Sequence, residues 1–227
     1  MAVVHARMGS TRFPGKMLEI LGTQPILEWV LRRTLKVRGL DGYVLATSRL
    51  SQDDVLVDLA TNIGISVFRG SHDNVLERVI GAGDQVGAAA IVRVCADNPF
   101  VDPDLVTDLV DDYRKNWCDY LFNHRPGVGL NIADGFGSEI FDFSILKSIE
   151  NEFREPRYRE HLTTAYWEHP EKFSIRSLRP PADLAHSELR FDVDTPDDLR
   201  YLRQLVSKGN LTTDSPAQAI VSVAHAR

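Results

Sequence analysis

The chain has little of what marks several large classes of protein. Its 227 residues include two cysteines, Cys95 and Cys118, which are too few for a disulfide framework and lack the spacing of a zinc site. No apolar run approaches the length that spans a bilayer, and residues 1–7 contain no signal-peptide core. These absences argue against a secreted or membrane protein and predict a cytoplasmic one with no membrane partner.

Positive charge is also scarce. The 26 lysines and arginines are outnumbered by 32 aspartates and glutamates, which gives a net charge of −6 and a pI near 5.6. Broad nucleic-acid binding requires a basic face, so no nucleic-acid partner is expected. An acidic chain that binds a polyphosphate must instead concentrate its cations at one place.

Strand and helix patterns alternate through the first half of the chain. Strands are predicted at residues 2–6, 43–47, 66–69 and 89–95, and helices at residues 25–37, 51–63, 74–86 and 102–115. Residues 51–54 resemble a capping box. This alternation predicts an α/β fold with a doubly wound, mostly parallel sheet. Ligands of such sheets bind beyond the carboxyl ends of the strands, so the loops after residues 6, 47, 69 and 95 are expected on one face.

The second half of the chain is less regular. Residues 124–137 form a long Gly-rich loop, and a loop of this length inside a compact domain is usually functional. Strands are predicted at residues 138–143, 174–178 and 190–194, and helices at residues 144–152, 157–169 and after Thr195. The whole chain fits one large α/β domain with a modest insertion.

The cations gather in the loop that follows the first predicted strand. Arg7, Arg12 and Lys16 lie within ten residues, among small residues that let main-chain N–H groups approach an anion. The loop departs from a P-loop, because Ser10 replaces the opening glycine and Met17 stands where Ser or Thr would bind magnesium. From spacing alone, the loop is either a phosphate-binding loop or a solvated basic loop.

Acidic side chains follow two predicted strands. Asp97 comes after the strand at residues 89–95, and Asp192 and Asp194 end the strand at residues 190–194. Oxygen ligands converging from two strand ends suit a magnesium ion that also holds phosphate oxygens. The alternatives are a turn residue at Asp97 and a helix cap at Asp194.

Five blocks, in order along the chain, resemble the sugar-acid cytidylyltransferases, the family of CMP-sialate and CMP-KDO synthetases, and most closely their spore-coat-polysaccharide branch. The blocks are ARMGSTRFPGK (6–16), FRGSHDNVLER (68–78), RVCADNP (93–99), REH (159–161) and DVDTPDDL (192–199). The resemblance implies one Rossmann-like nucleotidyltransferase domain over residues 1–227. Within it, residues 124–178 are expected to form an inserted segment for sugar binding and dimer contact.

The resemblance also implies an activity. The expected enzyme is a Mg²⁺-dependent cytidylyltransferase that joins CTP to a 3-deoxy-2-keto sugar acid and releases pyrophosphate, in surface polysaccharide biosynthesis. The implied catalytic residues are Arg7, Arg12, Lys16 and Asp97, and the implied nucleotide-binding residues are Ala6, Met8, Gly9, Ser10, Ser71 and Arg78. The implied sugar-binding residues are Asp134, Glu139, Arg159, Glu160 and His161, and the implied metal ligands are Asp97 with Asp192, Asp194 or both.

Three departures from the family pattern stand out. His5 replaces the usual Gln before the basic loop, Ala96 replaces a common Gly before Asp97, and Gly137 stands where related sequences often carry an acid. Three alternatives remain open: a sugar-1-phosphate nucleotidyltransferase, a GT-A-type glycosyltransferase, and a non-catalytic nucleotide-binding relative.

A homodimer is expected as well. Residues from about 124 to 170 extend beyond a minimal doubly wound sheet and carry apolar side chains that would need another surface. These are Phe141, Phe143, Ile145, Leu146, Leu162, Tyr166 and Trp167. Aromatic residues are enriched in the cores of interfaces, and related CMP-sugar synthetases are similarly dimeric.

Overall fold

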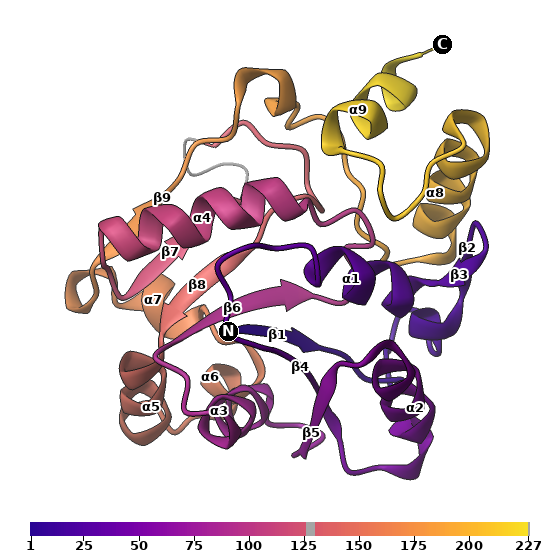
Figure 1. Cartoon of the computed structure of the whole chain (residues 1–227). Coiled ribbons are helices and arrows are strands. Elements are labelled where there is room, and N and C mark those ends of the chain that lie inside the picture. Colours follow the sequence, from indigo (N-terminus) through magenta and orange to yellow (C-terminus); the bar gives the residue numbers. More distant parts are fainter. Residues whose placement is uncertain (126–129, 227) are drawn as a thin grey trace.

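A computed structural model describes residues 1–125 and 130–226 and contains a seven-stranded central sheet (Figure 1). The strand order is β5-β4-β1-β6-β8-β7-β9. The strands are β1 (Ala2–His5), β4 (Tyr43–Ser48), β5 (Ser66–Gly70), β6 (Ala90–Cys95), β7 (Tyr120–Phe122), β8 (Glu139–Asp142) and β9 (Ile175–Ser177). A separate hairpin pairs β2 (Ile20–Leu21) with β3 (Gln24–Pro25).

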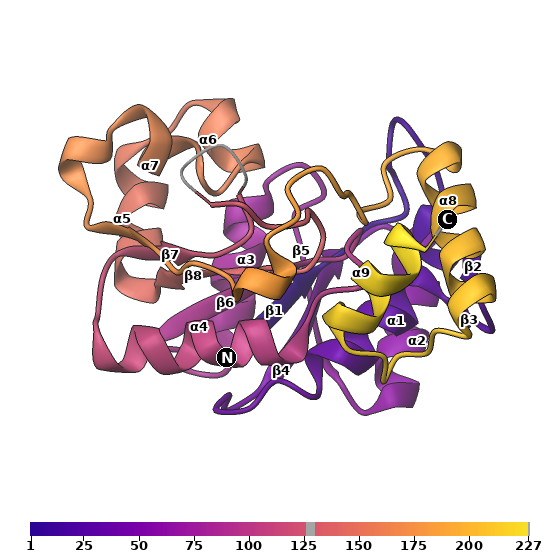
Figure 2. The same ribbon diagram turned by 90° about the horizontal axis from the view of Figure 1, so that it is seen from above.

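Helices cover both faces of the sheet (Figure 2). They are α1 (Ile26–Thr34), α2 (Asp54–Ile63), α3 (Val75–Gln85), α4 (Pro103–Lys115), α5 (Phe143–Glu152), α6 (Pro156–Glu160), α7 (Thr164–Glu168), α8 (Pro196–Gly209) and α9 (Ala217–His225). Side chains alternate between two cores: Ala2 and Val4 pack with α2 and α4, whereas Val3 packs with α3 and α5. A strand buried on both faces reads as a continuous apolar run, which is why β1 could be predicted.

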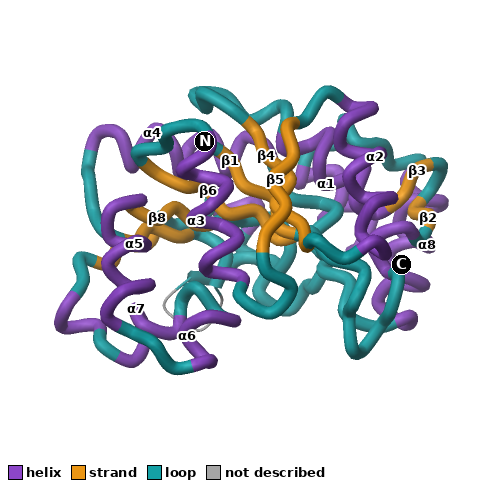
Figure 3. Tube along the Cα trace, turned by 90° about the horizontal axis from the view of Figure 1, so that it is seen from below, coloured by secondary structure: helices purple, strands orange, loops and turns teal. Residues whose placement is uncertain are grey.

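The fold predicted from the sequence, a doubly wound and mostly parallel sheet, is confirmed. Strands β5, β4, β1 and β6 are parallel, β8 runs antiparallel between β6 and β7, and β9 is parallel to β7. His5 pairs with Ala46 and with Cys95, so the loops after β1, β4 and β6 start from the same edge. Figure 3 shows the strands as one layer between helices. Among the helices of the described residues, none has the length and apolarity needed to cross a bilayer.

Two predicted elements of the second half are wrong. Residues 190–194 do not form a strand: their main-chain bonds go to Asp134, through an isolated parallel bridge with Arg190, and to Asp97. The helix predicted over residues 157–169 is interrupted at His161, whose extended backbone (φ −120°, ψ 104°) ends α6 before α7 begins. Tertiary contacts override local propensity at both places. Part of the predicted loop at 124–137, residues 126–129, lies outside the described residues.

The capping box predicted at residues 51–54 is also absent. Asp53 is buried, and its carboxylate accepts hydrogen bonds from the Met8 N–H (2.8 Å) and the Ser48 hydroxyl. A short 3-10 turn, Ser51–Asp53, precedes α2 instead, with no side-chain cap at either helix start. Asp53 therefore fixes the start of the basic loop rather than a helix end.

The expectation that aromatic side chains after residue 140 need a partner surface is wrong. Phe141 and Tyr166 are fully buried within the single chain, and both stack on Tyr120 with ring centroids 4.9 Å apart. Phe143, Leu146 and Leu162 are also buried, and Ile145 and Trp167 pack partly buried against the same core. The reason is β7, a strand that we did not predict and that carries Tyr120 into this core.

Candidate functional site

A pocket of about 300 Å³ opens at the carboxyl ends of β1 and β6. Five segments distant in sequence meet there: the end of β1 with the basic loop that follows it, the start of α3, the end of β6, the end of α6, and Asp194. The lining residues are His5, Ala6, Arg7, Ser10, Thr11, Arg12, Lys16, Met17, Val75, Arg78, Arg93, Cys95, Ala96, Asp97, Glu160, His161 and Asp194. The pocket thus lies where ligands bind to parallel sheets.

Lys16 joins the two acidic segments. Its ammonium group donates to the Val193 carbonyl (2.7 Å) and lies 3.1 Å from the Asp97 carboxylate and 3.5 Å from that of Asp194. The Val193 N–H in turn donates to the Asp97 carbonyl (2.8 Å). Asp97 and Asp194, separated by almost a hundred residues, therefore converge on one buried cation.

The Asp194 side chain does not cap α8. Thr195 occupies the cap position, and its side chain forms a reciprocal capping box with Asp198. Asp194 instead pairs with Arg12 (2.9 Å) and Arg190 (3.0 Å). Arg190 also holds both oxygens of Asp192, which does not line the pocket. Of the two late acids, Asp194 is therefore the one that faces the site.

Two arginines in the pocket lack an acidic partner. Arg7 donates to the His72 carbonyl (3.1 Å), and Arg78 donates to the carbonyls of Ser71 (2.7 Å) and His72 (3.2 Å). Within the described residues neither guanidinium is ion-paired, and the buried Arg78 Nε has no acceptor. Burial and the nearby Arg7 lower the pKa of Arg78. Two unpaired cations side by side are unfavourable unless an anion joins them.

The main chain of the basic loop adds further donors. Asp53 anchors its start through the Met8 N–H, and Gly15 takes a left-handed conformation (φ +79°) that turns the chain into Lys16. The N–H groups of Gly9, Thr11 and Arg12 have no acceptor in the part of the chain that the structure describes. A loop with free N–H groups and clustered cations can hold a polyanion.

Several predicted site residues lie outside the pocket lining. The Ser71 hydroxyl accepts from the Asn74 N–H, and Asn74 is the cap of α3. Arg159 donates to the Glu150 carbonyl (3.0 Å) and so ties α6 to α5. Asp134 forms the bridge with Arg190. Met8 and Gly9 belong to the basic loop but do not line the cavity.

A largely buried network includes two residues that line the pocket, His5 and Arg93, and two that do not, Glu139 and Tyr120. Of these, the sequence analysis assigned only Glu139, to sugar binding. Arg93 Nε donates to His5 Nε2 (2.8 Å), and its Nη1 pairs with Glu139, which also accepts from the Tyr120 hydroxyl. Arginine can only donate, so His5 Nε2 is the acceptor and the ring proton is on Nδ1. Burial, with Arg93 and Arg78, holds the pKa of His5 well below its ordinary value. The sequence feature that could have indicated this network is Arg93, the one charged residue in the otherwise apolar strand β6.

The neighbouring thiol is not a nucleophile. Cys95 lines the pocket, and burial raises its pKa to about 12. The thiolate is the reactive form of cysteine, so Cys95 stays protonated and inert near neutral pH.

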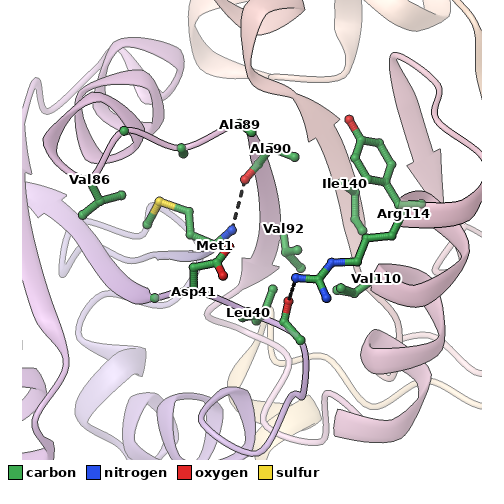
Figure 4. Close-up of a pocket in the computed structure, with 15 residues that line it drawn as sticks. Met1, Leu40, Asp41, Val86, Ala89, Ala90, Val92, Val110, Arg114 and Ile140 are labelled. Atoms are coloured by element: carbon green, nitrogen blue, oxygen red, sulfur yellow. Dashed lines mark hydrogen bonds between the residues drawn. The ribbon is translucent and has the colours of Figure 1, made fainter.

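A second cavity of about 340 Å³ lies at the opposite edge of the sheet (Figure 4). Its walls include Val92, Val110 and Ile140, and its polar groups are engaged locally: Arg114 donates to the Gly39 carbonyl (2.6 Å) and the Met1 nitrogen to the Ala90 carbonyl (3.1 Å). It lies at the amino ends of β1 and β6 and holds no converging pair of acids among the described residues. The pocket at the carboxyl ends is therefore the candidate site.

Comparison with known proteins identifies the family. A family model described as Cytidylyltransferase matches residues 1–220, nearly the whole chain. The chain belongs to the cytidylyltransferases.

Named relatives and a solved structure are similar to this cytidylyltransferase. The spore coat polysaccharide biosynthesis protein SpsF of Bacillus subtilis is 30% identical over 226 residues, covering 97% of this chain and 92% of SpsF. The 3-deoxy-manno-octulosonate cytidylyltransferase of Geobacter sulfurreducens is 28% identical over 117 residues, 51% of this chain and 45% of that protein. A cytidylyltransferase structure from Leptospira borgpetersenii aligns with a TM-score of 0.90 and 29% identity, covering 98% of this chain and 92% of that one.

One departure of this cytidylyltransferase from the family pattern has a steric reason. A Cβ added to Gly137 would lie 2.6 Å from the Asn123 side chain and 2.7 Å from the His124 main chain. The main chain cannot move away as a flexible side chain can, so the acid expected here from the resemblance does not fit this backbone.

The neutral state of His5 predicts a pH effect on stability. Below its ordinary pKa of 6.5, the unfolded chain binds a proton at residue 5 that the folded chain excludes. The free energy of unfolding should therefore fall as the pH decreases, by at most about 1.4 kcal/mol per pH unit from this group. His5→Gln keeps an acceptor for Arg93 and removes the titration. Urea unfolding between about pH 7 and pH 5 should show a smaller loss of stability in the variant; equal losses would mean that His5 titrates normally.

Proposed function

We propose that the chain couples CTP to a 3-deoxy-2-keto sugar acid, giving a CMP-sugar and pyrophosphate, for surface polysaccharide biosynthesis in the cytoplasm. The observation that carries this proposal is the pairing of two kinds of group in one pocket. Among the residues that the structure describes, Arg7 and Arg78 have no acidic partner, and Asp97 and Asp194 are acids that converge on one cation. The names of SpsF and of the octulosonate cytidylyltransferase support the sugar class.

The cationic half of the pocket suits the triphosphate of CTP. Arg7 and Arg12 approach it from the basic loop and Arg78 from α3, and the free N–H groups of the basic loop add neutral donors. Ala6 and Ser10 line the same wall, whereas Met8, Gly9 and Ser71 would act by shaping it. Fixed donors that need not reorganise stabilise developing phosphate charge efficiently.

The acidic half suits a magnesium ion. The Lys16 ammonium group lies between the carboxylates of Asp97 and Asp194, in a position that a metal ion would suit. Two hard oxygen ligands therefore already converge on one point. We propose that these two residues hold Mg²⁺ when nucleotide is bound. Asp192 would join them only if it released Arg190. Bound there, the metal would neutralise phosphate charge.

The reaction is a displacement at phosphorus. The anomeric hydroxyl oxygen of the sugar acid forms a bond to the α-phosphorus of CTP, the bond to the β-phosphate oxygen breaks, and the hydroxyl proton passes to solvent. Pyrophosphate leaves with its negative charge compensated by Arg7, Arg12 and Lys16. The protein contributes mainly by aligning the two substrates.

The sugar acid would enter from the side of α6. Glu160 and His161, at the end of that helix, line the pocket and are exposed to solvent. Arg159, Asp134 and Glu139 would act indirectly: Arg159 fixes α6 on α5, Asp134 fixes the segment that carries Asp194, and Glu139 fixes Arg93. We propose that Glu160 and His161 contact sugar hydroxyls.

The nucleotide preference tests the proposed substrate. CTP with magnesium should raise the unfolding temperature more than UTP, ATP or GTP at the same concentration, because only a ligand of the native state stabilises it by mass action. The measurement is a thermal melt with each nucleotide. Equal or larger stabilisation by UTP or ATP would reject cytidine specificity.

We also propose that the protein forms a homodimer. The aromatic side chains buried within the single chain, such as Phe141 and Tyr166, would not contribute to the dimer contact. Light scattering of the purified chain at micromolar concentration should give about twice the mass of 25.5 kDa. A mass near that of one chain, unchanged by CTP and magnesium, would mean that the enzyme is monomeric.

A further inference from the structure

Two histidines and a glutamate meet on the surface at the carboxyl-terminal helix. His186 and Glu188 lie on the segment that follows a short turn, Ala182–Leu184, and His225 is the last residue of α9. His186 Nδ1 lies 3.1 Å from Glu188 Oε1, and His225 Nε2 lies 3.4 Å from the same oxygen. The three ligand atoms are all within 4.8 Å of one another.

We propose that this cluster binds a zinc ion. Two imidazole nitrogens and one carboxylate oxygen are a typical ligand set for zinc, with a remaining position for water. Bonds of about 2.0–2.1 Å at tetrahedral angles place neighbouring ligand atoms about 3.3–3.4 Å apart. The observed separations of 3.1 Å and 3.4 Å bracket that value, so Glu188 and each histidine need move very little to share a metal.

The arrangement of the rings also leaves the cluster open to a metal. The imidazoles of His186 and His225 have centroids 4.6 Å apart at an interplanar angle of 66°, so their nitrogens are not blocked by face-to-face stacking. The exposed fractions of the side chains are 29% for His186, 60% for Glu188 and 45% for His225. Solvent therefore has access, and imidazole ligands favour zinc over magnesium, which prefers oxygen.

The metal would link two parts of the fold. Helix α9 packs against the turn that precedes His186 (Figure 2), and the segment continues from Glu188 through Arg190 to Asp194. On its other side this segment is held by the Asp134 N–H, which donates to the Leu189 carbonyl (3.0 Å). Zinc at the cluster would tie α9 to the segment that carries the acids of the pocket. The proposal depends on no step of the proposed reaction.

Zinc binding to the untagged, chelator-treated chain tests the proposal. Equilibrium dialysis followed by elemental analysis should give about one zinc per chain at micromolar zinc, undiminished by millimolar magnesium. Glu188→Gln and His225→Gln should each weaken binding by more than the tenfold to hundredfold that loss of a supporting residue costs, since each removes a direct ligand. Both substituted side chains are exposed, so far-UV circular dichroism should show folded variants.

Two control variants separate this site from others. His169 and Glu171 form a similar pair at the surface, 3.8 Å apart, without a third ligand among the described residues, so His169→Gln should leave zinc binding unchanged. Asp97→Asn reports any zinc held by the acids of the pocket and should also leave the zinc at the cluster unchanged. Zinc binding that survives Glu188→Gln and His225→Gln, disappears in Asp97→Asn, or is absent from the unsubstituted chain would overturn the proposal.

Discussion

Asparagine at position 97 or 194 should reduce the turnover number by about a hundredfold or more, with the fold intact. Each substitution keeps the shape of the side chain but removes the negative charge with which it would bind the proposed metal. Losing one preorganised electrostatic group in an active site costs about 10²–10³ in rate, or roughly 3–4 kcal/mol. Both acids line the pocket and both face Lys16, so each variant should show the loss alone.

The measurement is pyrophosphate release at saturating substrates, with circular dichroism to verify folding. Asp197→Asn is the matched control: Asp197 is 79% exposed in α8 and pairs with Arg200, away from the pocket. It should keep near-normal turnover. Near-normal turnover in both Asp97→Asn and Asp194→Asn would place the metal elsewhere.

Lys16→Met should lower kcat/KM by about 10²–10³. The ammonium group is the point at which the acids of the pocket meet, and the residue is only 7% exposed. Without it, Asp97 keeps no ion pair among the described residues, and Asp194 keeps only those with Arg12 and Arg190, so the repulsion between the two acids is less compensated in the absence of metal. Nucleotide titration by calorimetry should show weaker CTP binding with little dependence on salt, because a buried charge is poorly screened.

Arg12 provides the comparison. Its side chain is 66% exposed, so Arg12→Ala should weaken CTP binding less than Lys16→Met and in a way that salt diminishes. Arg200→Ala, an exposed arginine on α8, should leave affinity unchanged. Unaltered CTP affinity in both Lys16→Met and Arg12→Ala would mean that the basic loop does not bind phosphate and is only a solvated basic surface.

The parallel half of the fold could be predicted because its strands are buried on both faces. An apolar run such as residues 89–95 has one structural solution in an alternating α/β chain. The same reasoning failed at residues 190–194, where Phe191 and Val193 are buried but the main-chain partners are Asp134 and Asp97. The local pattern of apolar residues indicates which side chains are buried, but it does not indicate which main-chain groups form the hydrogen bonds.

The candidate site could also be predicted only in part from the sequence. The basic loop and Asp97 could be placed together because strand ends share an edge of the sheet. Asp194 meets them at Lys16 although its own segment forms no strand. Side-chain direction could not be predicted: Arg159 turns to Glu150, and Glu139 is buried with Arg93. The sequence pattern predicts Asp53 as part of a helix start, whereas its carboxylate accepts a hydrogen bond from the Met8 N–H and so holds the basic loop. Such roles depend on contacts between segments far apart in sequence.

The central claim is that this pocket transfers CMP from CTP to a keto sugar acid. Its most direct test is pyrophosphate release from CTP and magnesium with a panel of 3-deoxy-2-keto sugar acids, with mass spectrometry of the product. The account predicts release that requires one of these acids, with a CMP-sugar formed in equal amount. Release from another nucleoside triphosphate with a sugar 1-phosphate, and none from CTP with any keto sugar acid, would contradict it.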